Sequence, residues 1–494
     1  MKLFSFRGGI HPLERKERTR DLPIEVMPMP KRLYVPLQQH IGEPAVAIVS
    51  AGEKVRRGQL LGGSAGKVSA PVHSPADGVV VEVTEFASPH PAALPVTTAV
   101  IDVDDEQTPW QAPGEDPFTL SGEELARRIR EAGIVGMGGA TFPSAVKLDQ
   151  ARRHNVDTLI INGGECEPYL TCDDRLMQER GQQMLIGIEL MLRCLEASRA
   201  VIVVEDNKEA ALANLRRLCT NPERIRTVSV PTRYPQGSQK QMMQSVLGRE
   251  VPAGAHGVEL GAIMHNVATA FAVYEALVLG KPLVSRIVTV GGGAVARPAN
   301  LEVPFGTLVS ELLAHCDAAA DGDGFGYERL LMGGPMMGQW LPHPEVPIIK
   351  GSSGIIALSE EETRVTLPQP CIRCTRCVSV CPSGLLPLEL AKRIRKDDFE
   401  AAAELGLSDC IACGSCAYVC PSKIPLVQFF HYGKGQLQAR RVQSRKLERT
   451  AELASAKETR MEAIEREKAE AAAKRKAEQA AKKAAEAAAA ATEE

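Results

Sequence analysis

Residues 157–163, DTLIING, form a short apolar run that follows a segment of helical character. A run of this kind is typical of a strand buried on both faces of a parallel sheet. Similar strand-like runs and helix-like segments alternate around it along the chain, at 120–133, 175–198, 200–206, 207–219 and 225–231. This alternation predicts a doubly wound, Rossmann-like α/β domain built on a parallel sheet.

A glycine-rich loop is expected near the carboxyl ends of these strands, where parallel sheets bind ligands. It spans residues 133–148, GIVGMGGATFPSAVKL, and contains Gly136, Gly138 and Gly139 before a predicted helix that carries Lys147. Closely spaced glycines let backbone amides approach a phosphate, and the helix N-terminus adds a favourable dipole. The loop lacks the G-x-G-x-x-G fingerprint that follows a strand in the usual dinucleotide motif, and many glycine-rich turns bind nothing.

A second loop, INGGECEPYLTCDD at 161–174, begins at the end of the predicted strand. It gathers Asn162, Glu165 and Glu167, and carboxylates at this position suit ribose hydroxyls or a nicotinamide amide. A solvated acidic loop explains the same residues equally well. The later stretch VGGGAVARP, at 290–298, is instead predicted to be a hairpin turn because a proline follows its glycines closely.

The chain contains 13 cysteines, and eight of them form two groups with the same spacing, C-x2-C-x2-C-x3-C-P. The groups begin at Cys371 and Cys410, so the motif is duplicated at an interval of 39 residues. In two-cluster ferredoxins with this motif, three cysteines hold one cubane and the fourth reaches the other cluster. The spacing therefore predicts two [4Fe–4S] clusters, one held by Cys371, Cys374, Cys377 and Cys420 and the other by Cys410, Cys413, Cys416 and Cys381.

Structural zinc is the alternative for these cysteines, but zinc sites generally use two separated C-x2-C pairs rather than two complete groups of four. The segment between the groups, 385–406, is predicted to be helical, which gives a small α-helical ferredoxin-like domain. The five remaining cysteines are scattered along the chain. We expect most of them to be small buried apolar residues.

The composition excludes several classes of function. A chain of 494 residues is expected to form several domains. Its net charge of −3 and its aromatic content of 4% argue against nucleic acid as a partner. The first residues lack the apolar core of an export signal, and the most apolar stretch, around Glu275, is too short to span a bilayer. A reducing compartment is therefore expected, with free thiols rather than disulfides.

Four stretches resemble, in chain order, the flavin and NADH site of the complex I flavoprotein subunit. They are GMGGATFPSAVKL, NGGECEP, YPQGSQKQMMQSVLGREVP and HNVAT, at 136–148, 162–168, 234–252 and 265–269. With the paired cysteine motif and the opening FRGGIHP at 6–12, the chain up to about residue 435 resembles the RnfC subunits of the bacterial Rnf ion-translocating electron-transport complex.

This resemblance implies that FMN and NADH bind at the glycine loop and nearby residues, with no side chain assigned a catalytic role. The cofactor-binding residues that it carries over are Gly136, Gly138, Gly139, Lys147, Asn162, Glu165, Glu167, His265, Asn266 and Thr269. A flavin suits this layout because it connects the two-electron chemistry of a nicotinamide with one-electron iron–sulfur clusters.

The resemblance further implies an NADH-dependent oxidoreductase, or translocase, subunit. Hydride would pass between NADH and FMN, and single electrons would pass through two [4Fe–4S] clusters to other Rnf subunits, including integral-membrane and iron–sulfur subunits. Ferredoxin or flavodoxin would be served indirectly, ion translocation would be coupled to the electron flow, and the chain would be peripheral at the cytoplasmic face of the bacterial inner membrane. The alternative is a flavin-free iron–sulfur relay and docking subunit that binds no nucleotide.

The complete prediction is a multidomain α/β chain. Its N-terminal part resembles the barrel-sandwich hybrid of biotinyl and lipoyl domains, with Lys67 as an unmodified residue, and the part after the flavin domain resembles a β-grasp module of the soluble-ligand-binding type. The tail is rich in Ala, Lys and Glu and is expected to be helical or disordered. The predicted barrel, flavin domain, β-grasp module, ferredoxin-like domain and tail span 1–115, 116–284, 285–350, 365–432 and 436–494.

Overall fold

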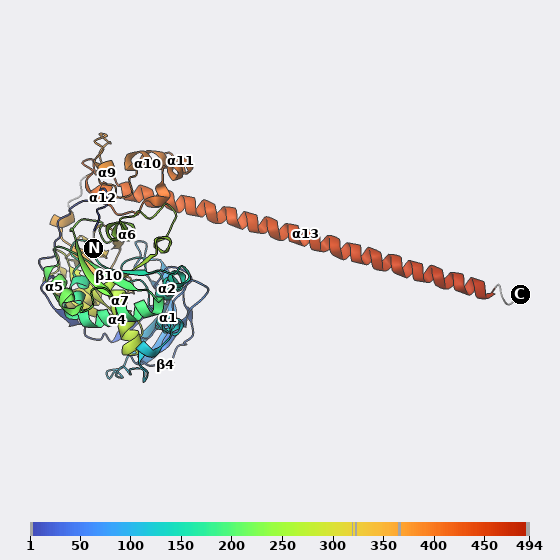
Figure 1. Ribbon diagram of the computed structural model, residues 1–494, viewed down its shortest axis with the longest axis horizontal. Coiled ribbons are helices and arrows are strands. Elements are labelled where there is room, and N and C mark those ends of the chain that lie inside the picture. The colour runs from blue at the N-terminus through green and yellow to red at the C-terminus, as the bar shows by residue number, and fades with distance from the viewer. Residues whose placement is uncertain (1–2, 319, 322–323, 364–366, 491–494) are drawn as a thin grey trace. The chain divides into compact units, whose positions relative to one another are not determined.

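The computed structural model describes residues 3–318, 320–321, 324–363 and 367–490, and Figure 1 shows their helices and strands. The chain forms two compact units. The first comprises Met1–Leu388 and Asp409–Val427, and the second comprises Glu389–Ser408 and Gln428–Glu494. Among the described residues, no helix combines the length and the apolar character needed to cross a membrane.

A four-stranded sheet lies at the centre of the predicted flavin domain. Its order is β11–β10–β9–β12, and every neighbouring pair is parallel. The four strands are β9 (Thr158–Gly163), β10 (Arg199–Glu205), β11 (Ile225–Val230) and β12 (Ala262–Asn266). The predicted parallel sheet is therefore present, and β12 joins it as a strand that the sequence patterns did not indicate.

Both faces of this sheet are covered, which explains the uninterrupted apolar run in β9. Leu159 and Ile161 pack into the largest core of the chain, whereas Ile160 packs into a separate core on the other face. The first core receives side chains from α1 (Gly122–Glu131), α2 (Ser144–Arg153), α3 (Cys172–Glu179), α4 (Gly181–Leu195), α5 (Glu209–Leu218) and α7 (Val267–Val278). The second core is closed by α6 (Gln239–Leu247).

The single helix predicted over 175–198 is wrong, because α3 ends at Glu179 and α4 begins at Gly181. Asn214 of α5 supplies the reason. Its side-chain amide donates to the carbonyl oxygens of Met177 and Gln178, at 3.0 and 3.1 Å, and so satisfies two of the last carbonyls of α3. A Cβ on Gly181 would lie 2.9 Å from the same amide nitrogen, so glycine permits this close approach.

The N-terminal part forms two small antiparallel sheets around one shared core, as expected for a barrel-sandwich hybrid. One sheet has the order β2–β8–β7–β4 and the other β3–β5–β6. The core contains Leu33, Leu61, Val80 and Ile101, all of them fully buried. The strands are β2 (Arg32–Pro36), β3 (Val46–Ala47), β4 (Lys54–Val55), β5 (Leu60–Gly63), β6 (Val72–His73), β7 (Gly78–Ala87) and β8 (Pro95–Val103).

A six-stranded mixed sheet follows the flavin domain, in the order β1–β14–β13–β19–β17–β18. The predicted hairpin turn at 290–298 is confirmed, because the strands on either side of it pair antiparallel. Strands from outside 285–350 also join the sheet, since β1 comes from the N-terminal region. Its elements are β1 (Ile24–Val26), β13 (Ser285–Gly291), β14 (Ala299–Pro304), β17 (Arg329–Met332), β18 (Gln339–Leu341), β19 (Gly354–Leu358) and α8 (Val309–His315), with a small pair formed by β15 (Ala320–Asp321) and β16 (Gly324–Phe325).

The cysteine groups lie in short loops with one-turn helices, α9 (Arg376–Ser379) and α12 (Ser415–Tyr418), which contact each other. The segment predicted to be helical between them forms two helices, α10 (Pro387–Ile394) and α11 (Phe399–Glu404), because Asp398 caps a new helix with its carboxylate. The tail is helical: α13 (Leu426–Ala490) runs unbroken for 65 residues (Figure 1).

Candidate cofactor sites

The glycine loop that joins α1 to α2 is anchored to the N-terminus of α7. The Met137 amide donates to the Thr269 hydroxyl at 3.0 Å, and the Arg286 guanidinium donates to the Met137 carbonyl at 3.3 Å. Gly138 lies directly against Asn266, since a Cβ on Gly138 would be 3.0 Å from the Asn266 Cβ. The structure therefore brings the predicted loop residues to the predicted residues of HNVAT.

The tip of this loop is open. Gly136 closes the loop through its amide, which donates to the Phe142 carbonyl at 2.9 Å. Gly139 has a φ of +136°, a backbone conformation that strongly favours glycine. Apart from Gly139 and its two neighbours in the chain, no atom of the described residues lies within 4 Å of the position that a Gly139 Cβ would take. Gly138, Gly139 and Ala140 are also exposed, so the backbone at this tip is open to a ligand.

Asn162 and Asn266 stand side by side at the carboxyl ends of β9 and β12, where they are partners in the strand register. The Asn162 amide donates to the Gly237 carbonyl at 2.9 Å, which connects β9 to residues 234–237, called the YPQG loop below. The Asn266 amide donates to the Asp173 carboxylate at 2.7 Å, and its oxygen accepts from the Ala268 amide as the N-cap of α7. The two predicted asparagines therefore frame the sheet edge at which parallel sheets bind ligands.

Lys147, which is half-buried, and His265, which is buried, lie beside this edge. The Lys147 ammonium donates to the Met264 carbonyl, and burial lowers the pKa of Lys147 to about 8. Burial, and then the charge of Lys147, hold the pKa of His265 far below its usual value, so this imidazole is neutral. Its Nε2 atom is buried without a hydrogen-bond partner among the described residues. A bound ligand would satisfy such an atom.

Glu165 acts as the cap of α3. Its carboxylate accepts from the amides of Asp173 and Asp174, at 2.9 and 3.4 Å, which are orphan donors of the first helical turn. Lys16 lies 4.0 Å away and donates to the Glu165 carbonyl at 2.7 Å. Burial raises the pKa of Glu165, and the nearby Lys16 counteracts this.

Glu167 points to different neighbours, although only Cys166 separates it from Glu165. Its carboxylate accepts from the Met336 amide at 2.9 Å, in the turn between β17 and β18. The other carboxylate oxygen, Oε1, is buried and unpartnered within the described residues. Burial raises the pKa of Glu167 to about 7. The acidic residues expected to cluster past β9 therefore divide between two environments.

Sequence patterns missed Lys16, Asp173 and Arg286 around the same edge; Lys16 and Arg286 are buried there, and Asp173 is half-buried. Lys16 lies in a charged stretch that resembles a solvated surface, and only its long-range contacts reveal its position. Ligand atoms of Glu165, Cys172 and Asp173 come within 4.8 Å of one another, as in a metal site. The adjacent Lys16 ammonium opposes a cation there, so we assign no metal to this group.

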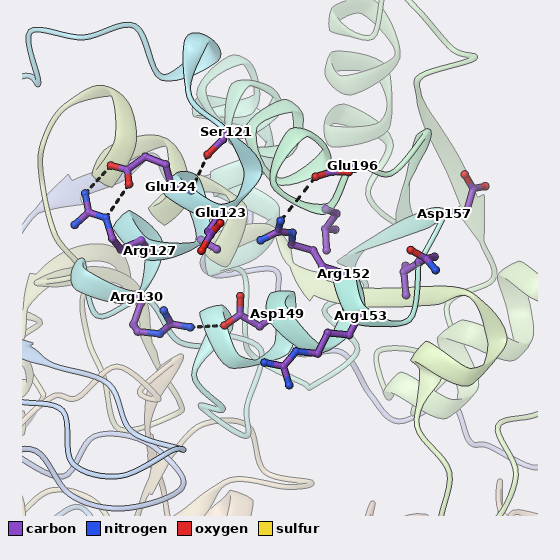
Figure 2. Close-up of a pocket in the computed structure, with 14 residues that line it drawn as sticks. Ser121, Glu123, Glu124, Arg127, Arg130, Asp149, Arg152, Arg153, Asp157 and Glu196 are labelled. Carbon is purple, nitrogen blue, oxygen red and sulfur yellow. Dashed lines mark hydrogen bonds and ion pairs between the residues drawn. The ribbon is translucent and has the colours of Figure 1, made fainter.

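A polar cavity of about 920 Å³ lies at the amino end of β9, away from these residues. In Figure 2, side chains of α1 and α2 face each other across it and form the ion pair Arg130–Asp149, while Arg152 of α2 pairs with Glu196. Because parallel sheets bind ligands at their carboxyl ends, this cavity is not the predicted flavin site.

The two cysteine loops repeat each other in detail. The Arg373 amide donates to the Cys371 sulfur at 3.4 Å, and the Ala412 amide donates to the Cys410 sulfur at the same distance. Hydrogen bonds of this kind support cluster thiolates and tune cluster potentials. Both loops therefore offer the same sulfur donor set, and this set fits an iron–sulfur cube.

Thiols of the two cysteine groups lie near one another. Burial raises the pKa of Cys416, and the neighbouring thiols Cys413, Cys410 and Cys381 raise it further. Burial likewise raises the pKa of Cys377, with smaller contributions from Cys374 and Cys420. Cys381 thus lies near thiols of the second group, and Cys420 lies near Cys377 of the first group, as a crossed ligand arrangement would require.

The second cysteine loop touches the flavin side of the chain. The Tyr234 hydroxyl donates to the Cys413 carbonyl at 2.6 Å, and both residues pack in one apolar cluster with Ile10. The opening FRGGIHP adds two hydrogen bonds at 2.8 Å: Ile10 donates to the Tyr234 carbonyl, and Gly9 donates to the carbonyl of Val380, at the end of the first cysteine group. One apolar cluster therefore joins the N-terminus, the YPQG loop and the second cysteine loop.

Three family models match the chain. The RnfC barrel sandwich hybrid domain matches residues 4–106, the Nuo51 FMN-binding domain matches residues 129–275, and the 4Fe-4S dicluster domain matches residues 370–424. The chain therefore contains an FMN-binding domain and an iron–sulfur domain, and the predicted fold class is confirmed.

Relatives of known name match nearly the whole chain. The C subunit of the ion-translocating oxidoreductase complex of Rhodobacter capsulatus is 48% identical over 449 residues, which cover 90% of this chain and 85% of that protein. The protein of the same name from Serratia proteamaculans is 41% identical over 94% of this chain and 65% of that protein.

A solved NAD+-reducing [NiFe]-hydrogenase, in the H2-reduced state, is 20% identical with a TM-score of 0.47, over 63% of this chain and 61% of that chain. A likeness at this level supports no functional argument. The two bacterial relatives are different, since their identity extends through the barrel, the flavin domain and both cysteine loops. The chain belongs to the RnfC family, which comprises the C subunits of the ion-translocating oxidoreductase, or Rnf, complex.

Proposed function

We propose that this electron-transfer subunit exchanges hydride between NADH and FMN and passes single electrons through two [4Fe–4S] clusters to other Rnf subunits. Membership of the RnfC family supports the electron-transfer role. The observation that carries the finer proposal is the contact of Tyr234 with Cys413, because it joins the predicted flavin edge to a complete set of four thiols.

The FMN site would be formed by the glycine loop and the carboxyl ends of β9 and β12. Gly139 offers an open amide, Thr269 holds the loop, and the unpartnered Nε2 of His265 is available to a ligand. A phosphate near Lys147 would favour its charged form and raise its lowered pKa. The remaining residues proposed to bind FMN or NADH are Gly136, Gly138, Asn162, Glu165, Glu167 and Asn266. When bound, FMN would accept hydride and release electrons one at a time.

The two clusters would have different positions in the electron path. Cys381, Cys410, Cys413 and Cys416 would hold the cluster nearer the flavin, and two of these thiols are buried. Cys371, Cys374, Cys377 and Cys420 would hold the second cluster, of which Cys371 and Cys374 are exposed. We therefore propose that electrons from NADH reach the buried cluster first and leave through the exposed one.

The partners would be the other subunits of the complex, including integral-membrane and iron–sulfur subunits, with ferredoxin or flavodoxin served through them. The electron flow would be coupled to ion translocation, and the chain would lie at the cytoplasmic face of the inner membrane. This placement is supported by the names of the relatives.

Anaerobic purification of the full chain tests the proposal. We expect one FMN, about eight irons with matching acid-labile sulfide, and bleaching of the flavin absorbance on addition of NADH. A preparation that contains both clusters but no flavin, and that never responds to NADH, would leave only the alternative function, a flavin-free iron–sulfur relay. Zinc in place of iron would contradict the electron path altogether.

A further inference from the structure

The duplicated cysteine loops serve as an internal comparison. Arg373 and Ala412 occupy equivalent positions and share a φ of +54°, and Thr375 and Gly414 have φ values of +60° and +81°. Both loops also make the same amide–sulfur hydrogen bond. Because the backbone is the same, side chains that differ between the loops are not required by cluster geometry.

The surroundings of the two loops are opposite. The second loop is packed against the protein: Ser415 and Cys416 are buried, and a Cβ on Gly414 would lie 3.1 Å from the Met336 carbonyl oxygen. The first loop faces solvent, with residues 371–376 all exposed and Ile372 exposed to 68%. An exposed aliphatic side chain beside a predicted cluster requires an explanation that the loop fold does not supply.

The two cysteine loops also differ in charge. Segments 367–388 and 409–427 contain three basic residues, Arg373, Arg376 and Lys423, and one acidic residue, Asp409. Asp409 is paired with Lys240 at 3.3 Å. Across the described ranges, no carboxylate forms an ion pair with any of the three basic side chains. Where the second loop has Ala412 and Ser415, the first loop has the two arginines.

We propose that residues 371–376 form a docking face for an acidic one-electron carrier protein of ferredoxin type. Ile372 supplies an apolar contact, and Arg373 and Arg376 lie in the same exposed loop. Lys423 lies close to this loop in the chain fold, because the hydroxyl of the preceding Ser422 donates to the Pro370 carbonyl at 3.0 Å. The positive charge of these side chains attracts carboxylates of the partner. The inference rests on the proposed function only in that the first loop carries a cluster, and it goes beyond that function because the carrier binds this chain directly rather than through another subunit. The step it serves transfers one electron from that cluster to the partner's cluster, and no bond or proton changes.

The arginines have one competing explanation, which is that their charge stabilises the reduced cluster and so sets its potential. The two roles differ in their dependence on salt. Attraction between exposed charges on two proteins weakens as the Debye length shortens, whereas the potential of a cluster is an internal property of one protein. Binding measured against salt, together with a redox titration, therefore separates docking from tuning.

The test uses the full chain with its clusters and the double variant Arg373→Ala with Arg376→Ser, which gives the first loop the side chains of the second. The control is Lys54→Ala with Lys67→Ala, which removes two exposed charges from the barrel domain. Affinity for an acidic two-cluster ferredoxin is measured by biolayer interferometry at low and high salt. We expect the loop variant to bind about 10-fold more weakly at low salt, with a flatter salt dependence, while the control matches the parent chain.

An Ile372→Ser variant adds a salt-independent readout, since we expect it to weaken binding at both salt concentrations. Failure of the parent chain to bind, equal losses in the control, or a changed cluster potential with unchanged binding would each overturn the docking proposal. Flavin bleaching by NADH is followed in the same samples. Its absence, with ferredoxin binding intact, would remove the proposed NADH activity and leave the docking face in place.

Discussion

Single residues in this chain acquire their properties from distant partners. Glu165 and Glu167 are separated by one residue, yet the first caps α3 beside Lys16 and the second accepts from Met336 in a turn of another sheet. The two glutamates therefore have different electrostatic surroundings. Glu165 has a nearby cation, whereas Glu167 has a buried carboxylate oxygen that lacks a partner among the described residues.

The raised pKa of Glu167 should be visible in the pH dependence of the free energy of unfolding. Burial raises its pKa to about 7, whereas an unfolded glutamate titrates near pH ~4.3. Between these values the folded chain holds a proton that the unfolded chain has lost, so the stability that this group contributes decreases as pH rises. We expect Glu167→Gln to stabilise the cofactor-free chain by about 2–3 kcal/mol at pH 8 and to have little effect at pH 4, as measured by chemical denaturation. An equal gain at both pH values would contradict this origin.

Thr269 should matter for flavin binding more than for folding. Its hydroxyl accepts the Met137 amide and so fixes the glycine loop. Thr269→Val keeps the volume but leaves that amide without its acceptor, which costs about 1–2 kcal/mol. We expect FMN affinity to fall about 10-fold in a fluorescence titration, and Thr269→Ser, which retains the hydroxyl, to bind as the parent does. Unchanged affinity in the valine variant would exclude this role.

At the scale of elements, loops from distant parts of the chain assemble the electron path. The YPQG loop contacts β9 through Asn162 and the second cysteine loop through Tyr234. The N-terminal segment then bonds to the YPQG loop through Ile10, and to Val380 at the end of the first cysteine group through Gly9. Separate short elements, rather than one helix or strand, therefore determine which cluster lies next to the flavin.

Replacing Cys381 or Cys420 should damage one cluster in each case. Cys381→Ser removes a thiol near Cys410, Cys413 and Cys416, so we expect EPR to show damage to that cluster, together with loss of reduction of the other cluster by NADH. Cys420→Ser is the matched control, and it should damage the exposed cluster while the buried one remains reducible by NADH. Damage to the cluster of Cys371 in the Cys381 variant would refute the crossed assignment.

At the scale of the whole molecule, the packed interior of the second unit is confined to residues 389–408 and the first turns of α13. Phe399 and Tyr432 pack edge to face with ring centres 5.7 Å apart, and Arg440 pairs with Glu400 and lies over Phe399. Between residues 438 and 487, every residue but Ala463 is exposed. The distal part of α13 therefore has no core of its own to lose.

Truncation of α13 tests whether only its first turns contribute to stability. A chain that ends at Thr450 keeps Phe430, Tyr432 and Arg440, so we expect its iron content, flavin content and melting temperature to match those of the full chain. A chain that ends at Val427 loses the buried Phe430 and should be destabilised by about 3 kcal/mol or more. A loss of flavin or iron in the longer truncation would show that α13 supports the cofactor sites.

The features that depend on local spacing follow from the amino-acid sequence alone. The alternation of apolar runs and helical segments predicts the parallel sheet because both faces of its strands must be buried, and the cysteine spacing predicts cubane ligands because one short loop wraps each cube. Four other features follow from the folded chain: the break between α3 and α4, the burial of Lys16, the separation of Glu165 from Glu167, and the exposure of one cysteine loop while its copy is packed against the protein. These features depend on contacts such as Asn214 with Met177, Lys16 with Glu165 and Met336 with Gly414, and no local pattern encodes a contact between residues so far apart in the chain.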